Sequence, residues 1–357
     1  MILLPFTKII VRFIIVCFWV AVISLLLFLP KLSTFFRTDK SITVFTFPML
    51  LDADFLSNFE KETGIKLHIS YYENNDELLV KMKESQGSEY DIIIPSDYAV
   101  ELLIKEGLLK KIDKSKLTFL KTIDPIFMGQ YFDPKNEYSI PYLWETYKIG
   151  IKSSFFKGKA PPASWRLIFD ETVAPNKIGM INNAREAILI AAFYLFGSID
   201  NLTKHKIEKV RQLLIKQKKW VEVYTDLRAD YLLLSGMVSV AVGMSGEIWH
   251  ATRFDNGLDF LIPQEGTFMV IDSIALPIKS SKDDLVYRFI NYLYRSDIVA
   301  FHVDKYSLFP VTTNVTLSHY FISSMEKILN ETKKLEFFRN VLSEEQLNEI
   351  WIELKAN

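Results

Sequence analysis

Phe132-Asp-Pro-Lys-Asn-Glu-Tyr-Ser-Ile-Pro-Tyr-Leu-Trp144 is the stretch that decides how this 357-residue chain is divided. It lies between two sets of alternating strand and helix patterns. The Ile140-Pro141 pair favours a turn, because proline has a fixed φ and no backbone N–H. Tyr142, Trp144 and Glu145 follow that pair. We therefore expect a turn here, with aromatic and acidic side chains in the loop after it.

Upstream of this stretch, strand patterns alternate with helix patterns. Ser41–Phe47 is rich in β-branched and aromatic residues, which predicts a buried strand. Gly64 and Gly107 supply the expected C-terminal stops of two helices. The further elements expected here are strands at 66–72 and 91–95 and helices at 54–63, 76–85 and 97–106. Strands separated by helices indicate a parallel α/β sheet with right-handed crossovers.

Downstream, a second set of patterns begins after Lys148–Ile151. The elements expected there are strands at 178–181 and 239–243 and helices at 184–196, 206–218, 285–294 and 345–354. The last two helices are expected to be packing elements. The chain then returns to the first unit near Asp272–Pro277. Two such crossings would tie two lobes together.

The N-terminus carries an uncharged apolar run, Phe13–Leu29, which is long enough to cross a bilayer. A secretory signal has a shorter core and a small-residue cleavage site, and Leu29–Phe35 offers no good site of that kind. We expect residues 1–38 to be an uncleaved membrane anchor, with a cleaved signal as the second choice. Lipidation of Cys17 is a further alternative, although Ile14–Val16 lacks the small residue usual before such a site.

Composition argues against several classes of function. Cys17 is the only cysteine, so the rest of the chain has no disulfide or cysteine metal ligand. A net charge of -1 gives no electrostatic basis for a nucleic-acid partner. Gly243–Gly246 is followed by Glu247, which breaks the Gly-x-Ser-x-Gly pattern of a nucleophile elbow. The histidines are scattered without a zinc-binding pair. We expect no catalytic residue, no metal and no cofactor.

Six ordered segments resemble polyamine-binding proteins of bacterial ABC importers. Besides the opening stretch they are Phe59–Leu67, Tyr90–Tyr98, Lys105–Leu117, Asn182–Glu186 and Ile271–Pro277. The resemblance implies a type II periplasmic-binding-protein fold, in which each of two α/β lobes is a sheet flanked by helices. The expected boundaries are 39–147 for the first part of lobe 1, 148–270 for lobe 2, 271–315 for the return to lobe 1, and 316–357 for C-terminal helices that pack on lobe 2.

The resemblance also implies a function and a location. The expected protein is a monomeric receptor, tethered on the periplasmic side of the cytoplasmic membrane, that captures putrescine or spermidine. It would deliver this ligand to an ABC permease driven by a cytoplasmic ATPase. Two alternatives stay open: a receptor of the same fold for a different small solute, and a two-lobed sensor without a transport role.

Candidate ligand-binding residues gather after the strands, where open α/β sheets bind their ligands. A polyamine needs carboxylates for its ammonium groups and aromatic walls for its methylenes. The family's aromatic positions fall on Tyr98 and Trp144, its acidic positions on Glu186 and Asp272, and a polar contact on Ser96. Without the resemblance, the rings fit core packing, Glu186 fits a helix N-terminus, and Asp272 fits a structural hydrogen bond.

Other cleft positions depart from the family pattern. Phe47 begins a Phe-Pro-Met-Leu run where relatives carry a Trp-Thr-x-Tyr-like run. Asn183 stands in place of an aspartate, and Met244 and Val270 stand in place of tryptophans. Such a cleft has fewer partners for a long amine, which predicts that putrescine loses less affinity than spermidine relative to typical relatives.

Two acids occur in expected cleft loops where the family usually has uncharged residues. Asp97 and Glu145 are these acids. Either could replace the missing carboxylate from another wall of the cleft, and the alternative is that both side chains point to water.

Overall fold

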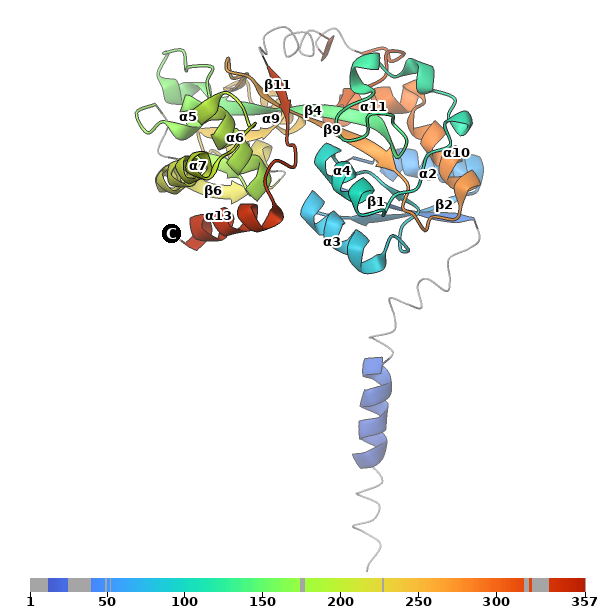
Figure 1. Cartoon of the computed structure of the whole chain (residues 1–357). Helices are drawn as coiled ribbons and strands as arrows, with labels where there is room; N and C mark the ends of the chain where they lie inside the picture. Colours follow the sequence, from blue (N-terminus) through green and yellow to red (C-terminus); the bar gives the residue numbers. More distant parts are fainter. Residues whose placement is uncertain are drawn as a thin grey trace, which may run out of the picture.

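The computed structural model describes residues 12–24, 40–48, 50–51, 53–173, 177–226, 228–317, 321–322 and 334–356. Its main body consists of two α/β lobes that lie side by side (Figure 1). Two long strands, β4 (Ser139–Lys152) and β9 (Thr267–Ala275), run from one lobe into the other. These strands pair with each other in antiparallel fashion, so they form the structural link between the lobes.

Lobe 1 is built on β1 (Ser41–Thr46), whose six residues are all buried. β1 pairs in parallel with β2 (Lys66–Tyr71) on one side and with β3 (Ile92–Ile93) on the other. β3 in turn pairs antiparallel with the end of β9. The helices of this lobe are α2 (Ala53–Thr63), α3 (Asn75–Ser85), α4 (Asp97–Lys105), α10 (Asp283–Leu293) and α11 (Ser296–Tyr306).

Lobe 2 uses the second half of β4, which pairs antiparallel with β7 (Val240–Met244) and β8 (Leu258–Leu261). β5 (Ile178–Ile181) lies parallel to β7 and to β6 (Val221–Thr225). The helices of this lobe are α5 (Arg166–Phe169), α6 (Ala184–Phe196), α7 (Lys204–Gln217), α8 (Ala229–Leu234) and α9 (Ser245–Phe254). Short 3-10 helices fill connections at Lys114–Lys116, Leu120–Thr122, Pro125–Phe127, Ser153–Phe156 and Lys218–Trp220.

The predicted turn at Ile140-Pro141 is wrong, because both residues lie inside the continuous strand β4. The ladder between β4 and β9 shifts register between Pro141 and Leu143. Proline is tolerated in a strand at such an irregularity, since the missing N–H then breaks no regular ladder bond. Trp144 and Glu145 are therefore strand residues, not loop residues.

The C-terminal part of the chain contacts both strands of the link. β10 (Phe309–Pro310) pairs with β4, and β11 (Leu335–Phe337) pairs with β9 at Thr267–Met269. The last helix, α13 (Glu344–Ala356), packs against α6 and α7 of lobe 2. Buried Arg185 of α6 pairs with Glu344 of α13, which fixes one end of this helix.

The predicted N-terminal anchor, residues 1–38, lies mostly outside the described residues. Its described part, residues 12–24, is a helix with mostly exposed side chains, and it includes the exposed Cys17. Within the described ranges, we find no helix that combines the length and the apolar character needed to cross a membrane.

Candidate ligand-binding cleft

A cleft between the lobes contains about 660 Å³ of empty space, part of it open to solvent. Its walls come from the segments that follow β1, β2 and β3 in lobe 1 and β5, β6 and β7 in lobe 2. The carboxyl ends of both sheets therefore face one space, as the rule for open α/β sheets predicts. The residues predicted from the sequence that line it are Phe47, Ser96, Tyr98, Asn183, Glu186 and Met244.

Glu186 is held in the cleft by the start of α6. Asn183 is the N-cap of this helix, and its side-chain oxygen accepts a hydrogen bond of 3.1 Å from the Glu186 N–H. The Tyr147 hydroxyl donates to Glu186 Oε2 at 2.7 Å. Burial raises the pKa of Glu186 to about 8, although the Tyr147 hydrogen bond opposes this rise. Among the described residues, none forms an ion pair with this carboxyl group that would favour its charged form.

Two more acids of lobe 2 line the cleft, and the sequence analysis did not select them. Glu247, in the first turn of α9, accepts hydrogen bonds from the N–H groups of Met244 at 3.1 Å and Ala229 at 3.3 Å. Burial raises the pKa of Glu247 to about 7, although its side chain keeps some solvent exposure. Asp226 follows β6, and burial raises its pKa as well. The cleft therefore takes part of its acidity from residues that the sequence analysis did not select.

Aromatic rings form much of the lobe 1 wall. Tyr72 and Phe47 meet edge to face with ring centroids 5.8 Å apart. The Tyr72 hydroxyl donates to the Ile94 carbonyl at 2.6 Å, which fixes this ring. Tyr98 is buried at the start of α4, and the guanidinium carbon of Arg185 lies 4.7 Å from its ring centroid. These rings give the cleft apolar surfaces that also attract cations.

The charges that line the cleft are mainly negative. Among the described residues that line it, the four acids are Glu73, Glu186, Asp226 and Glu247, and the single base is Arg228. Arg228 is exposed, so it interacts with solvent as well as with the cleft. A cationic ligand with apolar segments is therefore the best complement to this surface.

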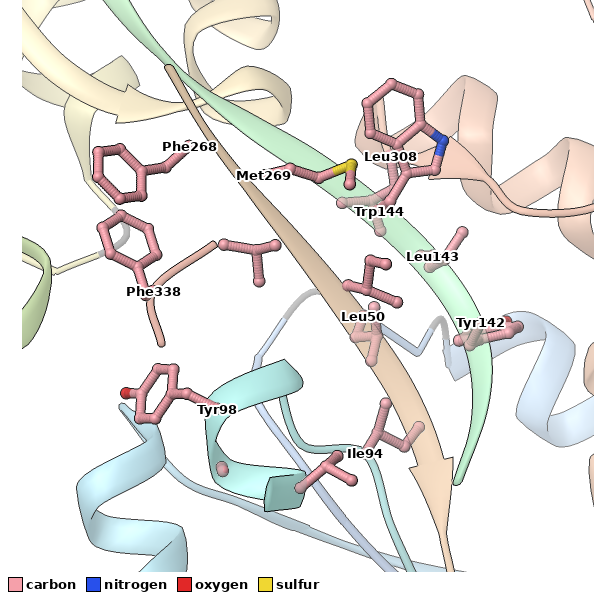
Figure 2. Packing of buried hydrophobic residues seen from close by; sticks show 14 of the residues in the cluster. Leu50, Ile94, Tyr98, Tyr142, Leu143, Trp144, Phe268, Met269, Leu308 and Phe338 are labelled. Carbon is pink, nitrogen blue, oxygen red and sulfur yellow. The ribbon is translucent and has the colours of Figure 1, made fainter. Parts of the chain in front are cut away.

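Trp144 does not line the cleft, although the sequence analysis assigned it there. It is fully buried, and its ring centroid lies 4.8 Å from that of Phe309 and 5.4 Å from that of Phe127. The indole N–H donates to the Pro310 carbonyl at 3.2 Å. Figure 2 shows the ring on β4 among other apolar side chains, including Leu308. Its position is that of a core residue of lobe 1.

Asp97 and Asp272 link α4 to the crossing strand β9. The Ser96 hydroxyl donates to Asp272 Oδ1 at 2.8 Å, and the Ile271 N–H donates to Asp97 Oδ2 at 3.2 Å. Both carboxyl groups are buried, and burial raises the pKa of each to about 7. Neither lines the cleft, and neither does Val270 on β9. Their contact with a ligand stays a prediction.

The residues missed by the sequence analysis had a usable signal. Asp226 directly follows β6, but this strand was not expected, so its carboxyl end was not searched. Glu247 lies three residues after β7 and was considered only as a break in a nucleophile motif. Tyr147 belongs to β4 beyond the predicted turn, where only its hydrogen bond to Glu186 reveals a role.

Comparison with known proteins agrees with this geometry. The family described as bacterial extracellular solute-binding protein matches residues 54–327. The spermidine/putrescine-binding periplasmic protein of Salmonella typhimurium is 32% identical over 243 residues, which are 68% of this chain and 69% of that protein. The putrescine-binding periplasmic protein PotF of Escherichia coli is 29% identical over 288 residues, or 76% of this chain and 77% of its own.

A solved structure shows the same fold. A chain from Listeria monocytogenes, attributed to a spermidine/putrescine ABC transporter, superposes with a TM-score of 0.78 at 27% identity. The superposition covers 89% of this chain and 99% of that one. The predicted two-lobed, type II periplasmic-binding-protein fold is thereby confirmed.

Proposed function

Since this chain belongs to the family of bacterial extracellular solute-binding proteins, we propose that it captures a polyamine of the putrescine or spermidine type for an ABC importer. One observation carries the proposal: four carboxylates and several aromatic rings line the cleft between the lobes, against one exposed guanidinium. The names of the curated relatives support the same ligand class.

The chemistry of the cleft fits a flexible amine with charged ends. An ammonium group loses water when it enters a cleft, so it needs a carboxylate partner within the protein. Glu186 offers this partner on α6, beside the Tyr147 hydroxyl. The methylene segments need apolar walls, which Phe47, Tyr72 and Tyr98 provide. Binding a cation at Glu186 would also relieve the cost of its burial.

Calorimetry of the purified protein with putrescine, spermidine and a panel of amino acids tests this function. We expect heat with the polyamines, and at least about tenfold weaker binding by Glu186→Ala, because the variant removes a buried charge partner. Glu349→Ala is the control, since Glu349 is exposed on α13. Binding of an amino acid but no polyamine would instead support a receptor for a different solute.

We also propose that the apolar run Phe13–Leu29 tethers the receptor to the outer face of the cytoplasmic membrane. A tether would hold the receptor near its permease and raise its effective concentration there. Fractionation of cells that produce the full chain tests this proposal. The protein should remain with membranes after a high-salt wash, whereas a chain that starts at Asp39 with a cleavable signal should be released as a soluble protein.

A further inference from the structure

A second pocket opens beside the cleft and shares part of its wall. Phe47, Met244 and Glu247 line both spaces. The second pocket contains about 830 Å³ of empty space, part of it open to solvent. Its far wall comes from the end of α11 and the segment after it, including Tyr306 and Leu308. The two spaces are therefore adjacent, with these three residues between them.

Glu145 gives this second pocket a buried acid. Its side chain is almost fully buried, and Oε1 accepts a hydrogen bond of 2.8 Å from the Gly246 N–H. The Ser245 hydroxyl also lies within 3.4 Å of Oε1. Burial, with smaller contributions from the Asp272 and Glu247 carboxylates, raises the pKa of Glu145 to about 8. Such a carboxyl group ionises readily only when a cation arrives beside it.

The other charged groups around the pocket leave it acidic. The Asp230 carboxylate lies 3.0 Å from His250 Nδ1 and accepts a hydrogen bond when that nitrogen carries the proton, and Glu247 is shared with the cleft. Among the described residues of the wall, Lys305 is the one lysine, and its ammonium lies 5.7 Å from the centroid of the Tyr306 ring. Three acids against one lysine and one histidine favour a cation over an anion. Apolar surface from Phe47, Pro48, Met244 and Leu308 suits methylene groups.

We propose that the second pocket extends the ligand site and receives one ammonium end of a linear tetraamine, with Glu145 as its partner. The proposal rests on the proposed polyamine function. Met244 is the side chain at the junction, where the family resemblance led us to expect a larger tryptophan. In this proposal, the smaller side chain leaves room for a ligand chain to pass from one space to the other. This reverses the preference for a short diamine that the same substitution predicted from sequence alone.

Competition calorimetry with the full chain, using a linear tetraamine and putrescine, tests the extension. We expect the parent to bind the tetraamine more tightly than the diamine. Glu145→Gln should lower the ratio of the two affinities at least about tenfold, because it removes a buried charge partner. Glutamine can still accept from the Gly246 N–H, so the fold is kept, and Glu349→Gln is the matched control on an exposed site.

A second variant, at Met244, tests whether the ligand extends from the cleft into the second pocket. Met244→Trp should narrow the junction and lower the same ratio, without a change of charge. Proton release gives an independent readout: at pH 7 the parent should release more protons per tetraamine than Glu145→Gln, measured in buffers of different ionisation enthalpy. If both amines bind and neither variant changes the ratio, the extension is refuted while the polyamine function stands. If neither amine binds, the function itself fails.

Discussion

The pH dependence of diamine binding follows from the buried carboxyl group of Glu186. Its pKa of about 8 means that about one molecule in a hundred is ionised at pH 6, and about half at pH 8. If the ammonium group binds only the carboxylate, affinity should rise about 50-fold between these values. Alkyl ammonium groups like that of lysine stay charged over this range, since their pKa is about 10.4.

Glu186→Gln is the perturbation that isolates this effect. Glutamine keeps the size of the side chain and an acceptor for the Tyr147 hydroxyl, but it does not titrate. The variant should bind more weakly at pH 8 and lose the 50-fold rise. If Glu247, with a pKa of about 7, also binds an ammonium group as a carboxylate, it adds a factor of about ten to the rise in the parent, and the variant keeps only this factor. Kd values measured by calorimetry at pH 6, 7 and 8, at constant ionic strength, give the pH dependence of the parent and of the variant.

The free energy of unfolding of the ligand-free protein should fall as the pH rises, whereas the affinity for the ligand rises. The folded pKa of Glu186 lies above its ordinary value of 4.5, so the unfolded chain releases this proton first. The group therefore contributes stability that is complete below pH 4.5 and declines as pH rises through about 8. Denaturant unfolding of the free protein should show lower stability at pH 8 than at pH 6. A parent whose Kd is the same at pH 6 and pH 8 would refute the reasoning.

Three further predictions concern the free energy of unfolding, measured by chemical denaturation. Trp144→Ala should destabilise the protein by about 3–5 kcal/mol, because it empties a fully buried site in the core. Gly150→Ala should cost about 1–3 kcal/mol, since a Cβ there would lie 2.5 Å from Leu233 Cδ1. Ser96→Ala should cost about 1–3 kcal/mol, because it removes the hydroxyl that donates to buried Asp272.

The exposed Ile352→Ala serves as the control for these three variants, because its side chain is 69% exposed and its loss should change little. A Trp144→Ala variant as stable as this control would contradict the core position of the ring. For Gly150→Ala, an unchanged midpoint would mean that Leu233 moves freely. For Ser96→Ala, the loss of stability should be larger at pH 8, where Asp272 is mainly ionised, than at pH 6. A loss at pH 6 with none at pH 8 would contradict the role of the hydroxyl as partner of the ionised Asp272.

Elements with strong local patterns were predictable from sequence. The helix at 184–196 was predicted with the bounds that α6 has, because its N-cap Asn183 and its C-terminal Gly197 mark both ends. β4 was not predicted as a continuous strand. Pro141 indicates a turn in isolation, and only pairing with β9, more than a hundred residues away, keeps it extended. The short strand β6 has an alternating Val-Glu-Val pattern that was not recognised as a strand.

A site residue could be predicted from the sequence where it follows the end of a single predicted strand. Asn183 and Glu186 follow β5 directly, and both line the cleft. Trp144 was assigned to the wrong surroundings because the face that a strand residue presents depends on what packs against that strand, here Phe309 of β10. The Glu145 pocket depends on the approach of α9 and α11, which lie far apart in the chain.

We expect the paired strands β4 and β9 to act as the hinge between the lobes. Its ladder runs from Ser139↔Ala275 to Thr146↔Met269, after which β4 takes β7 as its partner from Tyr147 onward. β10 also pairs with β4 at Leu143–Trp144 and β11 with β9 at Thr267–Met269, so the pair should bend most easily between these flanked positions, while its hydrogen bonds resist sliding. The lobes should consequently swing about this strand pair without breaking its ladder. Tyr147 lies where β4 changes partner, so we expect it to move little when the lobes move. Its hydrogen bond to Glu186 would then be kept, while the residues farthest from the two strands move most.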